Sequence, residues 1–534
     1  MSSQTWFFAI LLVTVVLQIA FCEVVVTTKY GKIRGIASNK TKAFLGVPYA
    51  APPVGKLRWK NPVSVAAWSP KVYDATKVKP GCPQKGCETM NPVLVCPEQT
   101  AEDCLYLYIW TPLSANTTTS FPVMVYIHGG NFVHMSADSL LFNAEELAYR
   151  GQVIVVTMDY RLGALGFLLT EDRRASSNYG ILDQRQAMKW VKDNIRAFGG
   201  NPNMVTLFGQ SAGAQSTIAH LLNKESSQYF QRAIVESAPL SIPFKTEEEM
   251  IFISNMLFDQ LNCSPKDLDC LNKYSADDIA EAQLKIRKYP SSLKLLEFFE
   301  PWVPYVDGVI IPSQPLEAFR KGLVINKPLM MGTVTEETRI FIYEAYNKSL
   351  PALEYSLALS LTFPKKALDV LQMYPPTVEP DQRDGLQVPA TDFIFTCCTR
   401  NFTRNVLKQN GGLVWTYVYD HAFSFPGWGK FTYCEGHVCH GSEIPFVFQS
   451  SKLGNFTITP DEMKLSNSLI AYWSNFAKTG NPNQGASVSL QWPVYESKSL
   501  WPQMFFSTPS NSVKSSYRRE YCDFWDSLGY TPSG

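Results

Sequence analysis

The pentapeptide Gly209-Gln210-Ser211-Ala212-Gly213 constrains the fold of this chain more than any other segment. A short apolar run precedes it, and a stretch of helical character follows it. A serine at such a strand-to-helix junction takes a strained backbone conformation, and small neighbours are needed for strand and helix to approach each other. The hydroxyl then lies at a helix N-terminus, where unpaired N–H groups favour negative charge. The pattern predicts that Ser211 is a nucleophile, and the alternative is an ordinary glycine turn.

The segments around this turn predict an α/β fold. Two apolar runs that end in glycine, residues 121–130 and 151–163, are typical of buried parallel strands. Residues 180–200 place apolar side chains at helical spacing and also end in glycines. This alternation predicts a mostly parallel central sheet flanked by helices on both faces. Helical patterns dominate from about residue 240, so we expect long helical insertions and one domain over residues 23–534.

A nucleophilic serine needs donors for the oxyanion that forms during acyl transfer. The segment IHGGNF, residues 127–132, follows the first of the two strands and supplies a glycine turn with exposed N–H groups. One such donor typically contributes about 3 kcal/mol to the transition state. Because the serine turn follows downstream, we interpret this segment as an oxyanion hole rather than as a plain strand exit.

The N-terminus indicates export. Residues 6–21 are apolar apart from Thr14 and Gln18, which is the length of a signal-peptide core and short for a membrane span. We expect residues 1–22 to be a cleaved signal peptide rather than a retained anchor, and the mature chain to have no membrane anchor. The protein is then secreted or lies in the lumen of the secretory pathway. Six glycosylation sequons fit this route: Asn39, Asn116, Asn262, Asn347, Asn401 and Asn455.

Charge and cysteine content exclude other classes of function. The formal net charge is +1 at pH 7 and no long basic run is present, so nucleic acid is not an expected partner. The twelve cysteines indicate disulfides in an oxidising compartment. A zinc site lacks support because short C-x-x-C pairs are missing among its four candidate ligands, Cys82, Cys87, Cys96 and Cys104. We expect no metal and no cofactor.

Serine becomes a nucleophile when a base removes its proton. In a strand–turn–helix site of this kind, the acid and then the histidine follow the serine along the chain. His128 and His134 precede Ser211, and His220 lies too close behind it. The three remaining candidates are His421, His437 and His440. The residues alone neither rank these three nor select an acid among 47 carboxylates.

Long segments of the chain resemble the type-B carboxylesterase/cholinesterase family of the α/β-hydrolase fold. They are FLGVPYAAPPVGKLRW (44–59), EDCLYLYIW (102–110), NYGILDQ (178–184), WVKDNIRAFGGNPNMVTLFGQSAG (190–213) and CHGSEIPFVF (439–448). The resemblance covers nearly the whole mature chain. It implies a serine carboxylic ester hydrolase that acts on small-molecule esters.

The resemblance also implies the catalytic residues Ser211, Glu337 and His440. The segment CHGSEIPFVF matches the histidine motif of the family, and KPLMMGTVTEETRIF (327–341) matches its acid segment. Glu336 is then a solvated neighbour. Thr338 stands where the family usually has glycine.

The oxyanion hole that the family implies is formed by the backbone N–H groups of Gly130, Asn131 and Ala212. Asn131 departs from the family, which usually has glycine or alanine there. Since the donor is a backbone group, it survives this change. The Asn131 side chain is expected to project near the hole.

The family pairs Cys82 with Cys104, Cys263 with Cys270, and Cys397 with Cys522. Proximity in the sequence adds Cys87 with Cys96 and Cys434 with Cys439. Cys398 is left over, as a free buried thiol or as a cysteine that pairs with another molecule.

Two positions bear on the substrate. Cholinesterases carry Glu before the nucleophile and a tryptophan that holds the quaternary ammonium by a cation–π contact. This chain has Gln210 and Met90 in those places. We therefore expect neutral or broad carboxylic esters as substrates, with choline esters disfavoured and both residues lining the pocket. The alternatives are a binding, adhesion or storage protein with weak or no activity, and lipase-like action on long acyl chains.

Overall fold

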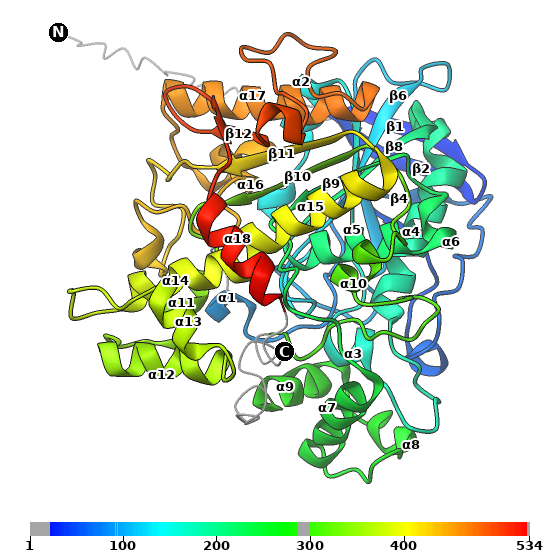
Figure 1. Ribbon diagram of the computed structural model, residues 1–534. Helices are drawn as coiled ribbons and strands as arrows, with labels where there is room; N and C mark the ends of the chain where they lie inside the picture. The colour runs from blue at the N-terminus through cyan, green and yellow to red at the C-terminus, as the bar shows by residue number, and fades with distance from the viewer. Residues whose placement is uncertain (1–21, 91, 93, 287–299, 531–534) are drawn as a thin grey trace, which may run out of the picture.

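A single large sheet forms the centre of the protein (Figure 1). The computed structural model describes residues 22–90, 92, 94–286 and 300–530. The predicted signal peptide, residues 1–22, lies outside this part of the chain apart from Cys22, where the first strand begins. None of the helices in the described ranges has the length and the apolar character that a bilayer crossing requires.

Thirteen strands of the described chain make up the sheet, in the order β1-β2-β3-β5-β7-β6-β8-β9-β10-β11-β12-β13, with β4 paired to β2. The run from β7 to β12 in this order is parallel, whereas β1, β2, β3 and β5 at one end and β13 at the other pair antiparallel. The strands are β1 Cys22–Thr28, β2 Gly31–Ala37, β3 Thr41–Pro48, β4 Val72–Asp74, β5 Tyr106–Pro112, β6 Phe121–Ile127, β7 Ile154–Met158, β8 Gly200–Gln210, β9 Arg232–Glu236, β10 Leu329–Val334, β11 Val414–Tyr419, β12 Pro502–Phe506 and β13 Ser512–Ser515.

Helices lie on both sides of the sheet and fill the long connections after β9 (Figure 1). They are α1 Cys87–Met90, α2 Glu145–Gly151, α3 Gly163–Phe167, α4 Tyr179–Asn194, α5 Ala212–Leu222, α6 Lys224–Ser227, α7 Glu247–Gln260, α8 Leu268–Leu271, α9 Ala276–Ile286, α10 Pro315–Arg320, α11 Arg339–Ala345, α12 Ala352–Thr362, α13 Ala367–Met373, α14 Arg383–Thr391, α15 Cys397–Asn410, α16 Ile444–Val447, α17 Pro460–Thr479 and α18 Arg519–Leu528.

Successive residues of the central strands enter two different cores. In β6, Val123 and Val125 belong to the core that contains α4 and α5, whereas Met124 and Tyr126 belong to the core that contains α2 and α17. Side chains alternate between the two faces of a strand, so helices bury both faces of the sheet here. This explains why the sequence of β6 is apolar without alternation.

The structure confirms the predicted α/β architecture, a mostly parallel sheet with flanking helices. The segments 121–130 and 151–163 contain β6 and β7, and α4, which begins one residue earlier at Tyr179, covers most of 180–200. The strand before Ser211 was expected to be short, but β8 has 11 residues. The sequence analysis did not predict β10 to β13. They have between four and six residues each, and long helical segments surround them.

Five disulfides join ten of the described cysteines. The pairs are Cys82–Cys104, Cys87–Cys96, Cys263–Cys270, Cys397–Cys522 and Cys434–Cys439. All four candidate zinc ligands are consumed in these bonds. Cys398 is free and buried. Burial raises the pKa of its thiol, so this side chain behaves as a small apolar residue rather than as a reactive thiolate.

The sequons differ in accessibility. Asn39, Asn116, Asn262, Asn347 and Asn455 are exposed. Asn401 is half-buried, and its Nδ2, the atom to which a glycan would be attached, donates to Asp526 at 2.9 Å. The first five sites therefore suit modification better than Asn401 does.

The disulfides are expected to contribute unequally to stability. Cys397–Cys522 joins α15 to α18 across 125 residues, whereas Cys263–Cys270 closes a loop of 7. Loop-closure entropy gives about 5 kcal/mol for the longer loop and about 2 kcal/mol for the shorter one. The Cys397→Ser, Cys522→Ser double variant should therefore unfold at a lower temperature than the matched Cys263→Ser, Cys270→Ser variant. Equal unfolding temperatures in a calorimetric comparison would contradict this ranking.

Candidate active site

Ser211 connects the end of β8 to the start of α5 in a strained conformation. Its backbone angles are φ 59° and ψ −125°, which few non-glycine residues adopt. The flanking glycines allow it. A Cβ on Gly213 would lie 2.0 Å from the carbonyl oxygen of Ile127, and one on Gly209 would lie 2.5 Å from the carbonyl oxygen of Gly213. Strand, turn and helix therefore pack at a distance that no larger residue permits.

The turn after β6 faces Ser211. A Cβ on Gly129 would lie 2.9 Å from the carbonyl oxygen of Gln210 and 3.0 Å from the Cβ of Ser211, so this turn and the serine turn touch. Gly130 and Asn131 have positive φ angles of 94° and 54°. Within the described chain, no group accepts a hydrogen bond from the N–H of either residue. Both donors remain available for an oxyanion.

Asn131 can take this place for a conformational reason. Among residues with a side chain, asparagine is one of the few that readily adopt the left-handed region, so it suits a turn where glycine is common. Its side chain borders the cavities described below. The third expected donor, the N–H of Ala212, belongs to the first residue of α5, where helix geometry provides no acceptor within the helix.

Glu337 and His440 form a close pair. Glu337 follows β10 and is fully buried, and its Oε2 lies 2.5 Å from Nδ1 of His440. Its other oxygen accepts a hydrogen bond from the N–H of Val334 at 2.9 Å. The carboxylate is thus fixed at both oxygens, and it orients the imidazole.

The neighbouring acid has a partner of its own. Glu336 accepts hydrogen bonds from the N–H of Val438 at 2.8 Å and from Nδ1 of His437 at 2.9 Å. The expectation of a merely solvated Glu336 was therefore wrong. The two consecutive acids contact two different histidines, and Glu337 is the one that faces His440. The Cys434–Cys439 bridge closes the loop that carries His437 and leads directly to His440.

Of the other described histidines, His134 alone borders the cavity that contains Ser211, and its Nε2 lies 3.0 Å from the carbonyl oxygen of Lys85. The rest lie away from that cavity. His128 and His220 are buried, and desolvation lowers their pKa values to about 4 and about 3. His421 lies 3.1 Å from the carboxylate of Glu462. The structure thus brings His440, and neither of the other two open candidates, to the cavity that contains Ser211.

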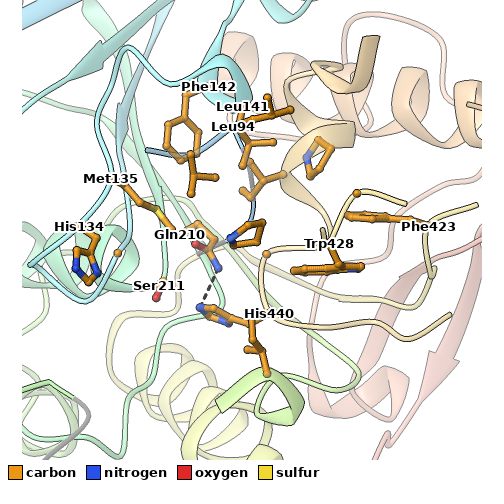
Figure 2. Close-up of a pocket in the computed structure, with 18 of the residues that line it drawn as sticks. Leu94, His134, Met135, Leu141, Phe142, Gln210, Ser211, Phe423, Trp428 and His440 are labelled. Atoms are coloured by element: carbon orange, nitrogen blue, oxygen red, sulfur yellow. Dashed lines mark hydrogen bonds between the residues drawn. The ribbon is translucent and has the colours of Figure 1, made fainter. Parts of the chain in front are cut away.

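His440 contacts Gln210 rather than Ser211 in this structure. No described group is hydrogen-bonded to the hydroxyl of Ser211. Instead, Nε2 of Gln210 lies 3.0 Å from Nε2 of His440, as the dashed line in Figure 2 shows. The neighbour of the serine occupies the imidazole nitrogen that would take the serine proton.

Ser211 opens onto two cavities of unequal size. The larger has a volume of about 370 Å³, and Figure 2 shows Gln210, Ser211 and His440 on its wall. Its other walls are mainly apolar and aromatic, with Leu94, Met135, Leu141, Phe142, Phe423 and Trp428 among them. The smaller, of about 50 Å³, shares Ser211, Asn131 and Phe341 with it. The side chain of Met90, the second predicted pocket residue, lies outside the described part of the structure.

Comparisons with known proteins agree with this geometry. Residues 23–525 match the model of the carboxylesterase family. The chain belongs to that family.

Its relatives include the cAMP-regulated D2 protein of Dictyostelium discoideum, which is 38% identical over 88% of this chain and 86% of the relative. An acetylcholinesterase of Bungarus fasciatus is 32% identical over 94% of this chain and 86% of the relative. A solved structure of a PNB esterase, 30% identical, superposes with a TM-score of 0.79 and covers 94% of this chain and 99% of that one.

Membership of the carboxylesterase family makes the chain a carboxylic ester hydrolase by descent and fold. The two cavities suit such a substrate, because an ester has two parts that extend from one carbonyl carbon. Among the described residues, no cluster of three or more histidine, cysteine or acidic side chains suits a metal ion.

Two further buried acids lie close to the site and were missed by sequence reasoning. Glu236, at the end of β9, is fully buried and accepts a hydrogen bond from Nε1 of Trp473 at 2.5 Å. Burial raises its pKa from 4.5 to about 8. Burial, together with Glu236 and Glu337, also raises the pKa of Glu443, three residues after His440. Their sequence signal was position alone: Glu236 ends a strand, and Glu443 lies within the histidine motif.

Glu236 should make stability depend on pH. Its folded-state pKa is raised, so between pH 4.5 and pH 8 the unfolded chain releases the proton while the folded protein retains it. Glu236 therefore destabilises the fold progressively as pH rises through this window. This cost disappears in the Glu236→Gln variant. The free energy of unfolding of the variant should therefore rise relative to that of the wild type, by up to about 1.4 kcal/mol per pH unit across this window. Unfolding temperatures of both proteins at pH 5 and pH 8 measure the difference.

The matched control is Glu354→Gln, a change at an exposed carboxyl on α12. Its effect on the unfolding temperature should be the same at both pH values. A Glu236→Gln advantage that is equally independent of pH would show that Glu236 is charged in the folded protein, contrary to this account.

Proposed function

We propose that this carboxylesterase-family chain is an active serine hydrolase that cleaves carboxylic esters through an acyl-enzyme. The observation that carries the proposal is the strained Ser211 turn packed against an N–H-rich turn, beside the bonded pair Glu337–His440. Strain of this kind persists where the surrounding structure holds it for a purpose. Here the purpose is to present the hydroxyl at the cavity wall.

In this mechanism Nε2 of His440 takes the proton of Ser211 as its oxygen attacks the ester carbonyl. The oxyanion accepts hydrogen bonds from the backbone N–H groups of Gly130, Asn131 and Ala212. The bond to the alcohol breaks, and the alcohol leaves with the proton from His440. Water then repeats the sequence on the acyl-enzyme and restores Ser211.

The substrates proposed are neutral esters of broad range. The wall of the larger cavity is mostly apolar, and Gln210 next to the nucleophile carries no charge. Glu344 is the one acid among the described residues that line this cavity. It is exposed, and Tyr433 donates to it. The described wall of the larger cavity therefore offers a choline cation no buried anion, which favours neutral alcohols over choline there.

A second candidate function is a binding or structural role without turnover. The observation that favours it is the contact of Gln210 with His440 in place of a contact with Ser211. Catalytic hydrogen bonds are often absent in a ligand-free site and form in the substrate complex. The serine, the histidine and two of the three proposed oxyanion donors border one cavity, so we place the active enzyme first.

We also propose that the protein is secreted or resides in the secretory lumen. Five disulfides among the described cysteines require an oxidising compartment to form and persist. The N-terminal apolar segment and the exposed sequons are consistent with the same route.

The proposal predicts that Ser211→Ala loses at least about a thousandfold in kcat on a short-chain p-nitrophenyl ester, because the hydroxyl that would accept the acyl group is removed. Ser356→Ala, at a half-buried serine on α12 that donates to the carbonyl of Ala352, is the matched control and should retain full activity. Steady-state hydrolysis by the purified proteins measures both.

Butyrylthiocholine is the second substrate in this experiment, and turnover of it should be much slower than turnover of the neutral ester. A folded wild-type protein that hydrolyses no tested ester and does not react with a fluorophosphonate would contradict the proposal. The binding or structural role would then remain.

A further inference from the structure

Gln210 has an unusual place for an amide side chain. It is the last residue of β8, directly before Ser211, and is only 5% exposed. Its backbone is fixed in the sheet, where it pairs with Glu236 of β9. Its side chain reaches across the cavity wall to Nε2 of His440, at 3.0 Å (Figure 2). The amide of Gln210 is thus hydrogen-bonded to Nε2 of His440, the nitrogen that would act as the base in hydrolysis.

The direction of this hydrogen bond follows from the other side of the ring. Nδ1 of His440 lies 2.5 Å from the carboxylate of Glu337, which accepts and does not donate. The ring proton is therefore on Nδ1, and in the neutral imidazole Nε2 is an acceptor. The amide N–H of Gln210 donates to its lone pair. Ser211 cannot use the same lone pair at the same time.

A glycine makes room for this arrangement. A Cβ on Gly129 would lie 3.1 Å from Oε1 of Gln210, which is closer than most such contacts, and Gly441 borders Nε2 of the amide on another side. The ring centroids of Phe341 and Phe395 lie 5.3 Å and 5.2 Å from the centroid of the His440 imidazole. The amide is therefore enclosed on the side of the protein and borders the larger cavity on the other.

We propose that Gln210 is a positioning residue that occupies Nε2 of His440 in the substrate-free protein and is displaced when an ester fills the larger cavity. This inference rests on the proposed function. Displacement moves no proton: the amide rotates away, and the freed lone pair accepts the hydrogen bond from the hydroxyl of Ser211. Gln210 lines the larger cavity and is absent from the wall of the smaller one, so the part of the ester in the larger cavity controls the release.

The charged groups around His440 leave this role to Gln210. Glu337 is hydrogen-bonded to Nδ1, the other ring nitrogen of His440. The remaining titratable groups on the surrounding elements are paired with other residues or are buried. Glu336 bonds to His437, Arg339 pairs with Glu336 and Asp384, Glu344 bonds to Tyr433, Asp392 bonds to Arg518, and Glu443 is buried with a raised pKa. The described structure has no other hydrogen bond to Nε2 of His440.

The test compares the wild type with Gln210→Met, which keeps the side-chain length without an N–H, and with Gln210→Glu. Losing the donor frees Nε2, so Gln210→Met should react with a small fluorophosphonate about fivefold faster at high pH. A donor also favours the neutral imidazole, so its loss should move the midpoint of the acidic limb of the kcat/KM profile up by about 0.7 pH unit. Gln210→Glu should move that midpoint further, because a carboxylate stabilises the imidazolium.

The profiles of the wild type and Gln210→Met should therefore coincide at low pH, where protonation of Nε2 removes the amide contact in both proteins, and separate at high pH, where the variant is about fivefold faster. A residue that merely packs the cavity wall would change the rate by the same factor at every pH. Equal labelling rates at high pH and an unchanged midpoint of the acidic limb, in variants with wild-type unfolding temperatures, would overturn the inference.

A readout without catalysis separates this inference from the proposed function. NMR of the folded protein labelled with ¹⁵N-histidine follows the titration of the His440 imidazole directly. If the wild type hydrolyses nothing, the proposed function fails, and the NMR titration alone decides on the Gln210 contact. A midpoint at higher pH in Gln210→Met supports the contact, and an unchanged midpoint overturns it.

Discussion

The close approach of two turns is the constraint on which the site depends. The end of β6 and the start of α5 are so close that a Cβ on Gly213 would lie 2.0 Å from the carbonyl oxygen of Ile127. Gly209 and Gly129 are restricted in the same way. This contact forces Ser211 into its strained conformation and turns the N–H groups after β6 toward it. The sheet and its two cores supply the rigidity that keeps the strain in place.

Glu337 and His440, the proposed acid and base, reach this point from the other half of the chain. Glu337 follows β10, and the loop closed by Cys434–Cys439 delivers His440. Behind them lie Glu236 and Glu443, and burial raises the pKa of both carboxyls. A raised pKa favours the uncharged carboxyl in the apolar interior, where a charge without a partner is costly.

Sequence reasoning predicted the half of the site that is local along the chain. Patterns of apolar residues and glycines predicted the strands before and after residue 150, the turn at Ser211 and the turn that contains Asn131. Glu337 and His440 came only from the family resemblance, because the short strands that position them lie between long helical segments. Neither route predicted the contact between Gln210 and His440. It depends on two side-chain conformations that meet across 230 residues, and no pattern along the sequence encodes that.

The central claim is that an ester transfers its acyl group to Ser211. The most direct measurement is peptide mass mapping of protein that is mixed with a p-nitrophenyl ester and quenched in acid within the first turnover. The account predicts one acyl group per chain, carried by the peptide that contains Ser211, and none in Ser211→Ala. An acyl group on another residue, or hydrolysis that proceeds without any adduct and survives in Ser211→Ala, would contradict it.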